Sequence, residues 1–158
     1  MLGFANLTLK IPYKRSCLAA LPDVFIFVYG SLRRSAQATR HELLAGASYC
    51  ADGYLYGKLY RVDDGYPGAV ESTRQEDKVF GELYRIADNS VLARLDDYEE
   101  CGETQAGPHE YLRKRLPIQL GDGTSIVAWV YLYNRDTTGL QRIMSGDFVV
   151  WQASCALL

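Results

Sequence analysis

The sequence has little of what most metal and redox sites require. No CxxC pair occurs among its cysteines, which are Cys17, Cys50, Cys101 and Cys155. The two histidines, His41 and His109, stand in no HExxH motif. This spacing supports neither a zinc ribbon, nor a thioredoxin-like redox motif, nor a histidine-based metal site. We expect reduced thiols in a cytoplasmic protein, and no metal.

An excess of charge and a long apolar run are also missing. The formal net charge is −2, so no surplus of cations is present to neutralise phosphates. The run Arg113-Lys114-Arg115 is short and is interpreted as a solvated strand face. Lys10, Lys14 and Arg15 interrupt the apolar start of the chain. We therefore expect no nucleic-acid partner and no membrane segment.

The size and composition fit one globular domain. The chain has 158 residues, of which 48% are hydrophobic and 23% charged, enough for a core without metal or disulfide staples. Residues 1–22 are predicted to be a tail or an extra strand, and residues 23–158 the domain. An over-extended start site is the alternative for residues 1–22. We expect a monomer or a weak homodimer.

The pattern of apolar residues predicts more strand than helix. Strands are expected over residues 24–29, 47–62 (one long strand or a bent pair), 79–86, 111–120 and 125–133. Residues 88–99 are the one segment with clear helical spacing. A short helix is also predicted over residues 41–45. The segment 140–158 is predicted to form irregular turns and a strand. Gly81, inside a strand, indicates a bulge or a close approach. Hairpin-like spacing favours a mixed or antiparallel sheet curled into a barrel.

The first predicted strand ends abruptly at Tyr29-Gly30-Ser31-Leu32. Glycine followed by serine leaves several backbone N–H groups exposed at the carboxyl end of the strand. Converging N–H groups can hold a carboxylate or an oxyanion. An ordinary turn after a strand is the alternative. The pattern alone favours that alternative, because glycine turns are common.

Glu99 falls on the apolar side of the predicted helix. Leu92, Leu95 and Glu99 recur at steps of three and four, which places them on the stripe facing the core. A carboxylate that loses solvent has a raised pKa and can exchange protons near neutral pH. The alternative is that Glu99 reaches solvent at the helix end. Spacing alone slightly favours the alternative, since buried unpaired carboxylates are rare.

Three further residues are ambiguous by pattern. Asp96 also lies near the stripe, and we interpret it as a partner of loop backbone or of an arginine. Tyr111 and Arg113 share one face of their strand. Such a pair could line a pocket, although cross-strand packing is the more usual role.

A series of short motifs runs along residues 24–150. They are Tyr29-Gly30-Ser31-Leu32, Tyr66-Pro67-Gly68, Gly81-Glu82-Leu83-Tyr84, Leu95-Asp96-Asp97-Tyr98-Glu99, Tyr111-Leu112-Arg113, Ala128-Trp129-Val130-Tyr131-Leu132-Tyr133 and Ser145-Gly146-Asp147-Phe148. Each motif is weak by itself. Taken in this order and at this spacing, they resemble the γ-glutamylcyclotransferase-like (AIG2-like) family.

The resemblance implies an α+β fold, a small mixed β-barrel flanked by short helices. It also implies an enzyme that acts on a small γ-glutamyl amine or amide without a cofactor. The α-amine of such a substrate attacks its own γ-carbonyl and gives 5-oxoproline and a free amine. The resemblance assigns the acid–base role to Glu99 and a pocket beside the Gly30-Ser31 loop. The residues expected to bind substrate are Tyr29, Gly30, Ser31, Leu32, Tyr111 and, with less support, Arg113.

Two other functions remain open from the sequence. A non-catalytic binding or regulatory protein could keep the same pocket, because a fold does not dictate a function. A deprotecting enzyme of a biosynthetic pathway could apply the same chemistry to a larger acyl group.

Overall fold

The computed structural model describes residues 23–34, 42–62, 65–101 and 106–157. The predicted tail over residues 1–22 lies outside the described residues. In chain order the elements are β1 (Val24–Val28), the 3₁₀ helix η1 (Glu42–Leu44), β2 (Ala47–Arg61), β3 (Pro67–Glu71), β4 (Lys78–Ile86), α1 (Ser90–Tyr98), β5 (Tyr111–Leu120), β6 (Ser125–Tyr133), β7 (Gln141–Arg142) and α2 (Phe148–Cys155). Every strand expected from the sequence is present, and residues 47–61 form one long strand.

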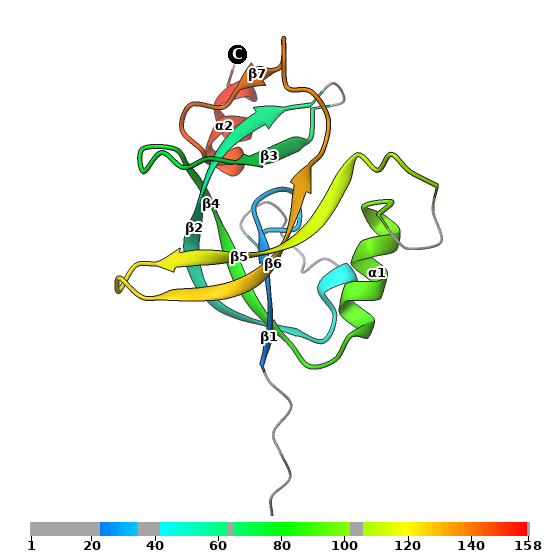
Figure 1. Ribbon diagram of the computed structural model, residues 1–158. Helices are drawn as coiled ribbons and strands as arrows, with labels where there is room; N and C mark the ends of the chain where they lie inside the picture. Colours follow the sequence, from blue (N-terminus) through cyan, green and yellow to red (C-terminus); the bar gives the residue numbers. More distant parts are fainter. Residues whose placement is uncertain (1–22, 35–41, 63–64, 102–105, 158) are drawn as a thin grey trace, which may run out of the picture.

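The sheet closes into a small mixed barrel, as expected (Figure 1). Its strands follow the order β2, β4, β1, β6 and β5, and β5 pairs back with β2. β1 and β6 are parallel, whereas the other pairs are antiparallel. The short strands β3 and β7 pair antiparallel with the C-terminal end of β2. A register shift between Tyr49 and Ala51 lets β2 bend around the barrel.

The barrel interior holds one apolar cluster. It includes Phe27 of β1, Tyr29 directly after β1, Leu83 of β4 and Ile118 of β5, all nearly inaccessible to solvent. Phe148 of α2 joins the same cluster, and Figure 1 shows α2 at one end of the barrel next to β3 and β7. The interior residues alternate along each strand with residues that face outward.

A second apolar cluster fixes α1 against the outside of the barrel. Val91, Leu92 and Leu95 of α1 pack with Ile26 and with Tyr131 of the neighbouring strands. The helical stripe predicted from the sequence is thus the contact face of α1. This packing sets the position of the residues that follow the helix.

Gly81 confirms the prediction of a close approach. A Cβ atom there would lie 2.4 Å from the carbonyl oxygen of Val28 and 2.5 Å from the Phe27 ring. β1 therefore lies close to β4 at the point where the chain leaves the barrel toward Gly30.

Two expectations about helices need correction. α1 ends at Tyr98, one residue before Glu99, although the Glu99 N–H still donates to the Leu95 carbonyl at 2.8 Å. The segment after residue 140 contains β7 and the helix α2, which was not expected. The side chain of Asp147 caps α2 by accepting from the N–H groups of Val149 and Val150. None of the helices in the described part of the chain is long and apolar enough to span a bilayer.

Candidate active site

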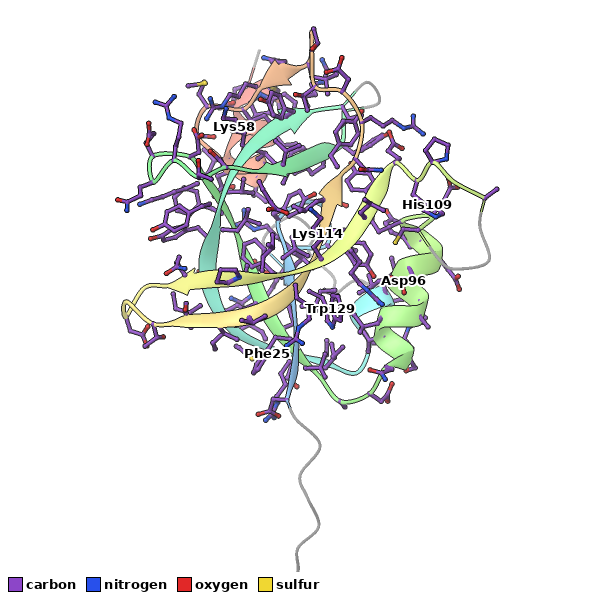
Figure 2. The ribbon with its side chains drawn as sticks, in the orientation of Figure 1. Phe25, Lys58, Asp96, His109, Lys114 and Trp129 are labelled. Carbon is purple, nitrogen blue, oxygen red and sulfur yellow. The ribbon has the colours of Figure 1, made fainter. Side chains whose placement is uncertain are left out.

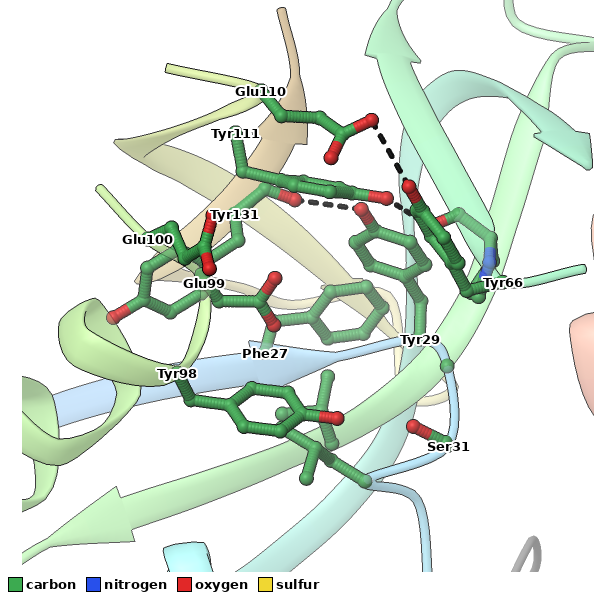
Figure 3. A pocket seen from close by; sticks show the side chains of 14 residues that line it. Phe27, Tyr29, Ser31, Tyr66, Tyr98, Glu99, Glu100, Glu110, Tyr111 and Tyr131 are labelled. Atoms are coloured by element: carbon green, nitrogen blue, oxygen red, sulfur yellow. Dashed lines mark hydrogen bonds between the residues drawn. The ribbon is translucent and has the colours of Figure 1, made fainter. Parts of the chain in front are cut away.

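A cavity of about 240 Å³ opens where β1 ends and α1 ends (Figure 3). Its lining brings together segments that are far apart in sequence: the turn after β1, the start of β3, the end of α1 and the start of β5. The lining residues are Phe27, Val28, Tyr29, Gly30, Ser31, Leu32, Tyr66, Pro67, Tyr98, Glu99, Glu100, Glu110, Tyr111 and Tyr131. Six of the seven residues expected at the site therefore line one cavity, and Arg113 is the exception.

The turn after β1 forms one wall of this cavity. The N–H of Arg33 donates to the Gly30 carbonyl at 3.1 Å, which closes a tight turn. No hydrogen bond joins the N–H group of Gly30, Ser31 or Leu32 to another residue that the structure describes. A Cβ on Gly30 would lie 2.7 Å from Cγ of Pro67, so only glycine allows this contact with β3. The turn thus lines the cavity, its N–H groups have no hydrogen-bond partner among the described residues, and Gly30 is tightly fitted against β3.

Glu99 lies opposite this turn, and its carboxylate points into the cavity toward the ring of Phe27 (Figure 3). Burial raises the pKa of Glu99 to about 7, and the negative charge of Glu110 adds to the rise. A carboxyl group with this pKa is divided between its two protonation states near neutral pH. It can therefore accept a proton and return it at little cost.

Two buried tyrosines, Tyr29 and Tyr111, line the cavity between the turn and Glu99. The Tyr29 hydroxyl donates to the Tyr131 carbonyl at 2.7 Å and accepts from the Ala69 N–H at 3.3 Å. The Tyr111 hydroxyl donates to the Pro67 carbonyl at 2.9 Å. Burial raises the pKa of both phenols, so both stay protonated. Since backbone groups already engage their hydroxyls, both rings act mainly as walls.

Glu100 and Glu110 also line the cavity, and Glu110 had no role in the sequence analysis. The Tyr66 hydroxyl donates to it at 3.0 Å, as Figure 3 shows, and the Arg135 guanidinium lies 3.7 Å away. Tyr66 lies in the expected Tyr-Pro-Gly segment, and Glu110 directly precedes the expected Tyr111. Their position beside known motifs was the signal available for finding them.

Arg113 lies away from this cavity, which corrects the expectation that it binds substrate there. It lines a different groove, donates to Asp96 at 2.8 Å and stacks over the ring of Trp129, 4.7 Å from its centre. Figure 2 shows Asp96 on α1 beside Trp129 of β6. The Tyr131 hydroxyl also donates to Asp96, at 2.7 Å. The interpretation of Asp96 as the partner of an arginine is confirmed, and Asp96 ties the last turn of α1 to the barrel.

The only cysteine thiol that the structure describes near Glu99 is that of Cys101. Burial, followed by the charge of Asp96, raises the pKa of this thiol to about 12. It keeps its proton at neutral pH and is a poor nucleophile. No three His, Cys, Asp or Glu side chains converge as a metal site within the described ranges.

Comparison with known proteins agrees with this architecture. The family model described as "Gamma-glutamyl cyclotransferase, AIG2-like" matches residues 26–152. The "Gamma-glutamylcyclotransferase family protein YtfP" of Escherichia coli K12 is 39% identical over 128 residues, covering 78% of this chain and 95% of the relative. The solution structure of E. coli ytfP matches with a TM-score of 0.54 and 35% identity, over 78% of this chain and 95% of that one.

A relative from Niallia circulans has a more specific name. It is the "Gamma-L-glutamyl-butirosin B gamma-glutamyl cyclotransferase", which is 30% identical over 113 residues. The match covers 70% of this chain and 67% of the relative.

Proposed function

The chain belongs to the gamma-glutamyl cyclotransferase, AIG2-like family, and we propose that it converts a γ-glutamyl amine to 5-oxoproline and a free amine. The observation that carries the proposal is Glu99, a carboxyl with a pKa raised to about 7. It shares one cavity with a glycine turn whose N–H groups are not hydrogen-bonded to any other described residue. Such a pairing suits a reaction that moves protons and holds the α-carboxylate of its substrate.

The reaction requires one group that exchanges protons. The ionised Glu99 carboxylate takes a proton from the α-ammonium of the substrate, which frees the nitrogen lone pair. The nitrogen attacks the γ-carbonyl carbon and closes the five-membered ring. The protonated Glu99 gives this proton to the departing nitrogen, and the carboxylate so regenerated removes the second proton from the ring nitrogen as the bond between the carbon and the departing nitrogen breaks. Glu99 then passes that proton to the free amine, which leaves as an ammonium ion. Glu99 ends in its starting state, and no covalent enzyme intermediate forms.

The glycine turn supplies binding and electrostatic stabilisation in this scheme. Its N–H groups hold the α-carboxylate of the substrate or the negative charge that develops on the γ-oxygen. Tyr29 and Tyr111 form the apolar walls that fold the γ-glutamyl chain back on itself. Because ring closure is mainly a problem of positioning, these walls contribute to the rate by limiting the conformations of the substrate.

The cavity of about 240 Å³ is open to solvent on one side, so a departing amine can extend out of it while the γ-glutamyl group lies inside. Including a bulky γ-glutamyl compound in the activity test separates an enzyme for small amines from a deprotecting enzyme. A cytoplasmic location remains a prediction from the scattered cysteines.

The proposal is tested by incubating the protein with a panel of γ-glutamyl amines and γ-glutamyl amino acids. We expect 5-oxoproline and the free amine in a one-to-one ratio. Release of glutamate in place of 5-oxoproline would indicate hydrolysis and contradict the ring-closing scheme. Thermal stabilisation by these compounds without any product would favour the non-catalytic binding protein.

The pH dependence of kcat/KM provides a second prediction. The reaction uses ionised Glu99, so kcat/KM should rise with pH through about 7. Glu110→Gln removes the charge that disfavours ionisation and keeps an acceptor for the Tyr66 hydroxyl. We expect the rise to move to lower pH, measured by initial rates across a pH series. A parent profile that already levels off at about pH 5 would mean a solvated Glu99 with an ordinary pKa.

Gly30→Ala is expected to lower kcat/KM about 10- to 100-fold, because a displacement of about 1 Å can have an effect of this size. The new methyl group would meet the Pro67 ring and push the turn away from the cavity. The matched control is Gly121→Ala, where a Cβ meets nothing within 4 Å. Equal kinetics for the two variants would show that the fitted turn does not matter for turnover.

A further inference from the structure

Glu82 is a buried carboxylate that the proposed reaction does not use. It lies in β4, is 2% exposed and contributes nothing to the lining of the cavity. Burying a carboxylate is costly unless partners compensate for the lost water. The groups that contact the Glu82 carboxylate therefore indicate which part of the structure it stabilises.

Two of these partners belong to the chain that leaves the cavity turn. The backbone N–H of Arg34 donates to Oε2 of Glu82 at 2.8 Å, and the Arg33 guanidinium lies 3.9 Å from Oε1. The Tyr84 hydroxyl donates to Oε2 at 2.7 Å and fixes the orientation of the carboxylate. In the sheet, Glu82 pairs with Val28, two residues before Gly30. Glu82 thus pairs through its backbone with the strand that leads into the turn, and its carboxylate contacts the residues that end the turn.

Arg33 extends this contact to the other end of the chain. Its guanidinium donates to Asp147 at 2.8 Å, and Asp147 also caps α2. Arg33 is 11% exposed at its side chain, so this ion pair is screened less than a surface pair. The turn is held between a carboxylate of β4 and the capping residue of α2.

We propose that Glu82 is a positioning residue, which fixes the turn Gly30–Arg34 so that its N–H groups meet the carboxylate of the substrate. The inference rests on the proposed function, in which this turn binds the γ-glutamyl group. The α-carboxylate is charged in the substrate and in the transition state alike, so a turn that holds this group contributes to binding more than to the chemical step, and its displacement should raise KM more than it lowers kcat. A merely structural ion cluster would change stability and leave KM unaltered.

The test compares Glu82→Gln and Glu82→Leu with the control Glu71→Gln. Glu71 forms an exposed ion pair with Lys114 on β5, so this control removes a carboxylate far from the turn. The amide of Glu82→Gln still accepts from Arg34 and Tyr84 but loses its charge toward Arg33. We expect KM to rise about tenfold in Glu82→Gln and about 100-fold in Glu82→Leu, with kcat changed by less than about threefold. Unchanged KM in both variants would overturn the inference.

A second measurement does not depend on turnover. Backbone ¹⁵N relaxation should show residues 30–34 losing order in both Glu82 variants, while β4 keeps the order seen in the parent and in Glu71→Gln. An equally ordered turn in Glu82→Gln and Glu82→Leu would overturn the inference. If the parent released no 5-oxoproline from any substrate, the proposed function would fail, and the relaxation data would still decide whether Glu82 positions the turn.

Discussion

Glu99→Gln is expected to lower kcat for 5-oxoproline release by about 10²- to 10⁴-fold, the usual contribution of a general acid–base group. Glutamine keeps the size and shape of the side chain but cannot take a proton from the α-ammonium. Because the turn and the tyrosine walls remain in place, binding of a γ-glutamyl amine should be nearly unchanged. Initial rates and substrate titration separate the two effects.

The matched control is Asp97→Asn, which changes an exposed carboxylate two residues earlier to its amide. It should leave kcat within about twofold, as is usual for an exposed residue away from the reaction. A Glu99→Gln variant that turned over as fast as this control would remove Glu99 from the mechanism.

Glu99→Gln is also expected to change the free energy of unfolding in a way that depends on pH. Folding raises the pKa of Glu99 from 4.5 to about 7, so its ionised form is disfavoured in the folded state. The resulting cost is absent below the unfolded value and develops as pH rises through this window. Glu99→Gln should therefore be more stable than the parent at about pH 8, by up to about 3 kcal/mol, and no more stable at about pH 4. Denaturant unfolding at both pH values measures this difference, and equal gains at both would contradict a buried, titrating Glu99.

Leu95→Ala is expected to destabilise the fold by about 2–5 kcal/mol, the usual result of deleting a fully buried leucine side chain. Leu95 is 0% exposed and packs between α1 and the barrel. In a domain of this size the loss corresponds to a decrease of about 4–20 °C in Tm. Because α1 carries Glu99 after its last turn, the surviving folded fraction should also lose activity.

Leu157→Ala is the matched control for this change. Leu157 is 88% exposed, so the same truncation there should alter stability by less than about 0.5 kcal/mol. Thermal unfolding followed by circular dichroism compares the two variants directly. Similar Tm values would mean that the contact face of α1 contributes little, against the packing described here.

The sequence predicted the barrel strands because their apolar residues alternate or run continuously. It predicted the core-facing position of Glu99 because Leu92, Leu95 and Glu99 share one helical stripe. α2 was missed because Phe148–Cys155 is rich in apolar and β-branched residues, which obscure the helical period. The capping residue Asp147 was a usable signal for that helix, since aspartate is favoured at this position.

Local patterns could not distinguish two positions on the same face of β5. Tyr111 and Arg113 occupy the same face of the strand, yet only Tyr111 lines the cavity with Glu99. Arg113 instead pairs with Asp96 of α1, a contact decided by how the helix packs on the barrel. Glu110 and Tyr66 meet across 44 positions of sequence, so their hydrogen bond follows only from barrel closure.

The most direct test is a structure of Glu99→Gln bound to an intact γ-glutamyl amine. The α-carboxylate should accept hydrogen bonds from the N–H groups of Gly30, Ser31 or Leu32. The α-amine should lie within about 2.6–3.2 Å of the side chain at position 99, with its nitrogen facing the γ-carbonyl carbon. A ligand bound away from the turn, or with its α-amine out of reach of residue 99, would contradict the assignment of this cavity as the site of ring closure.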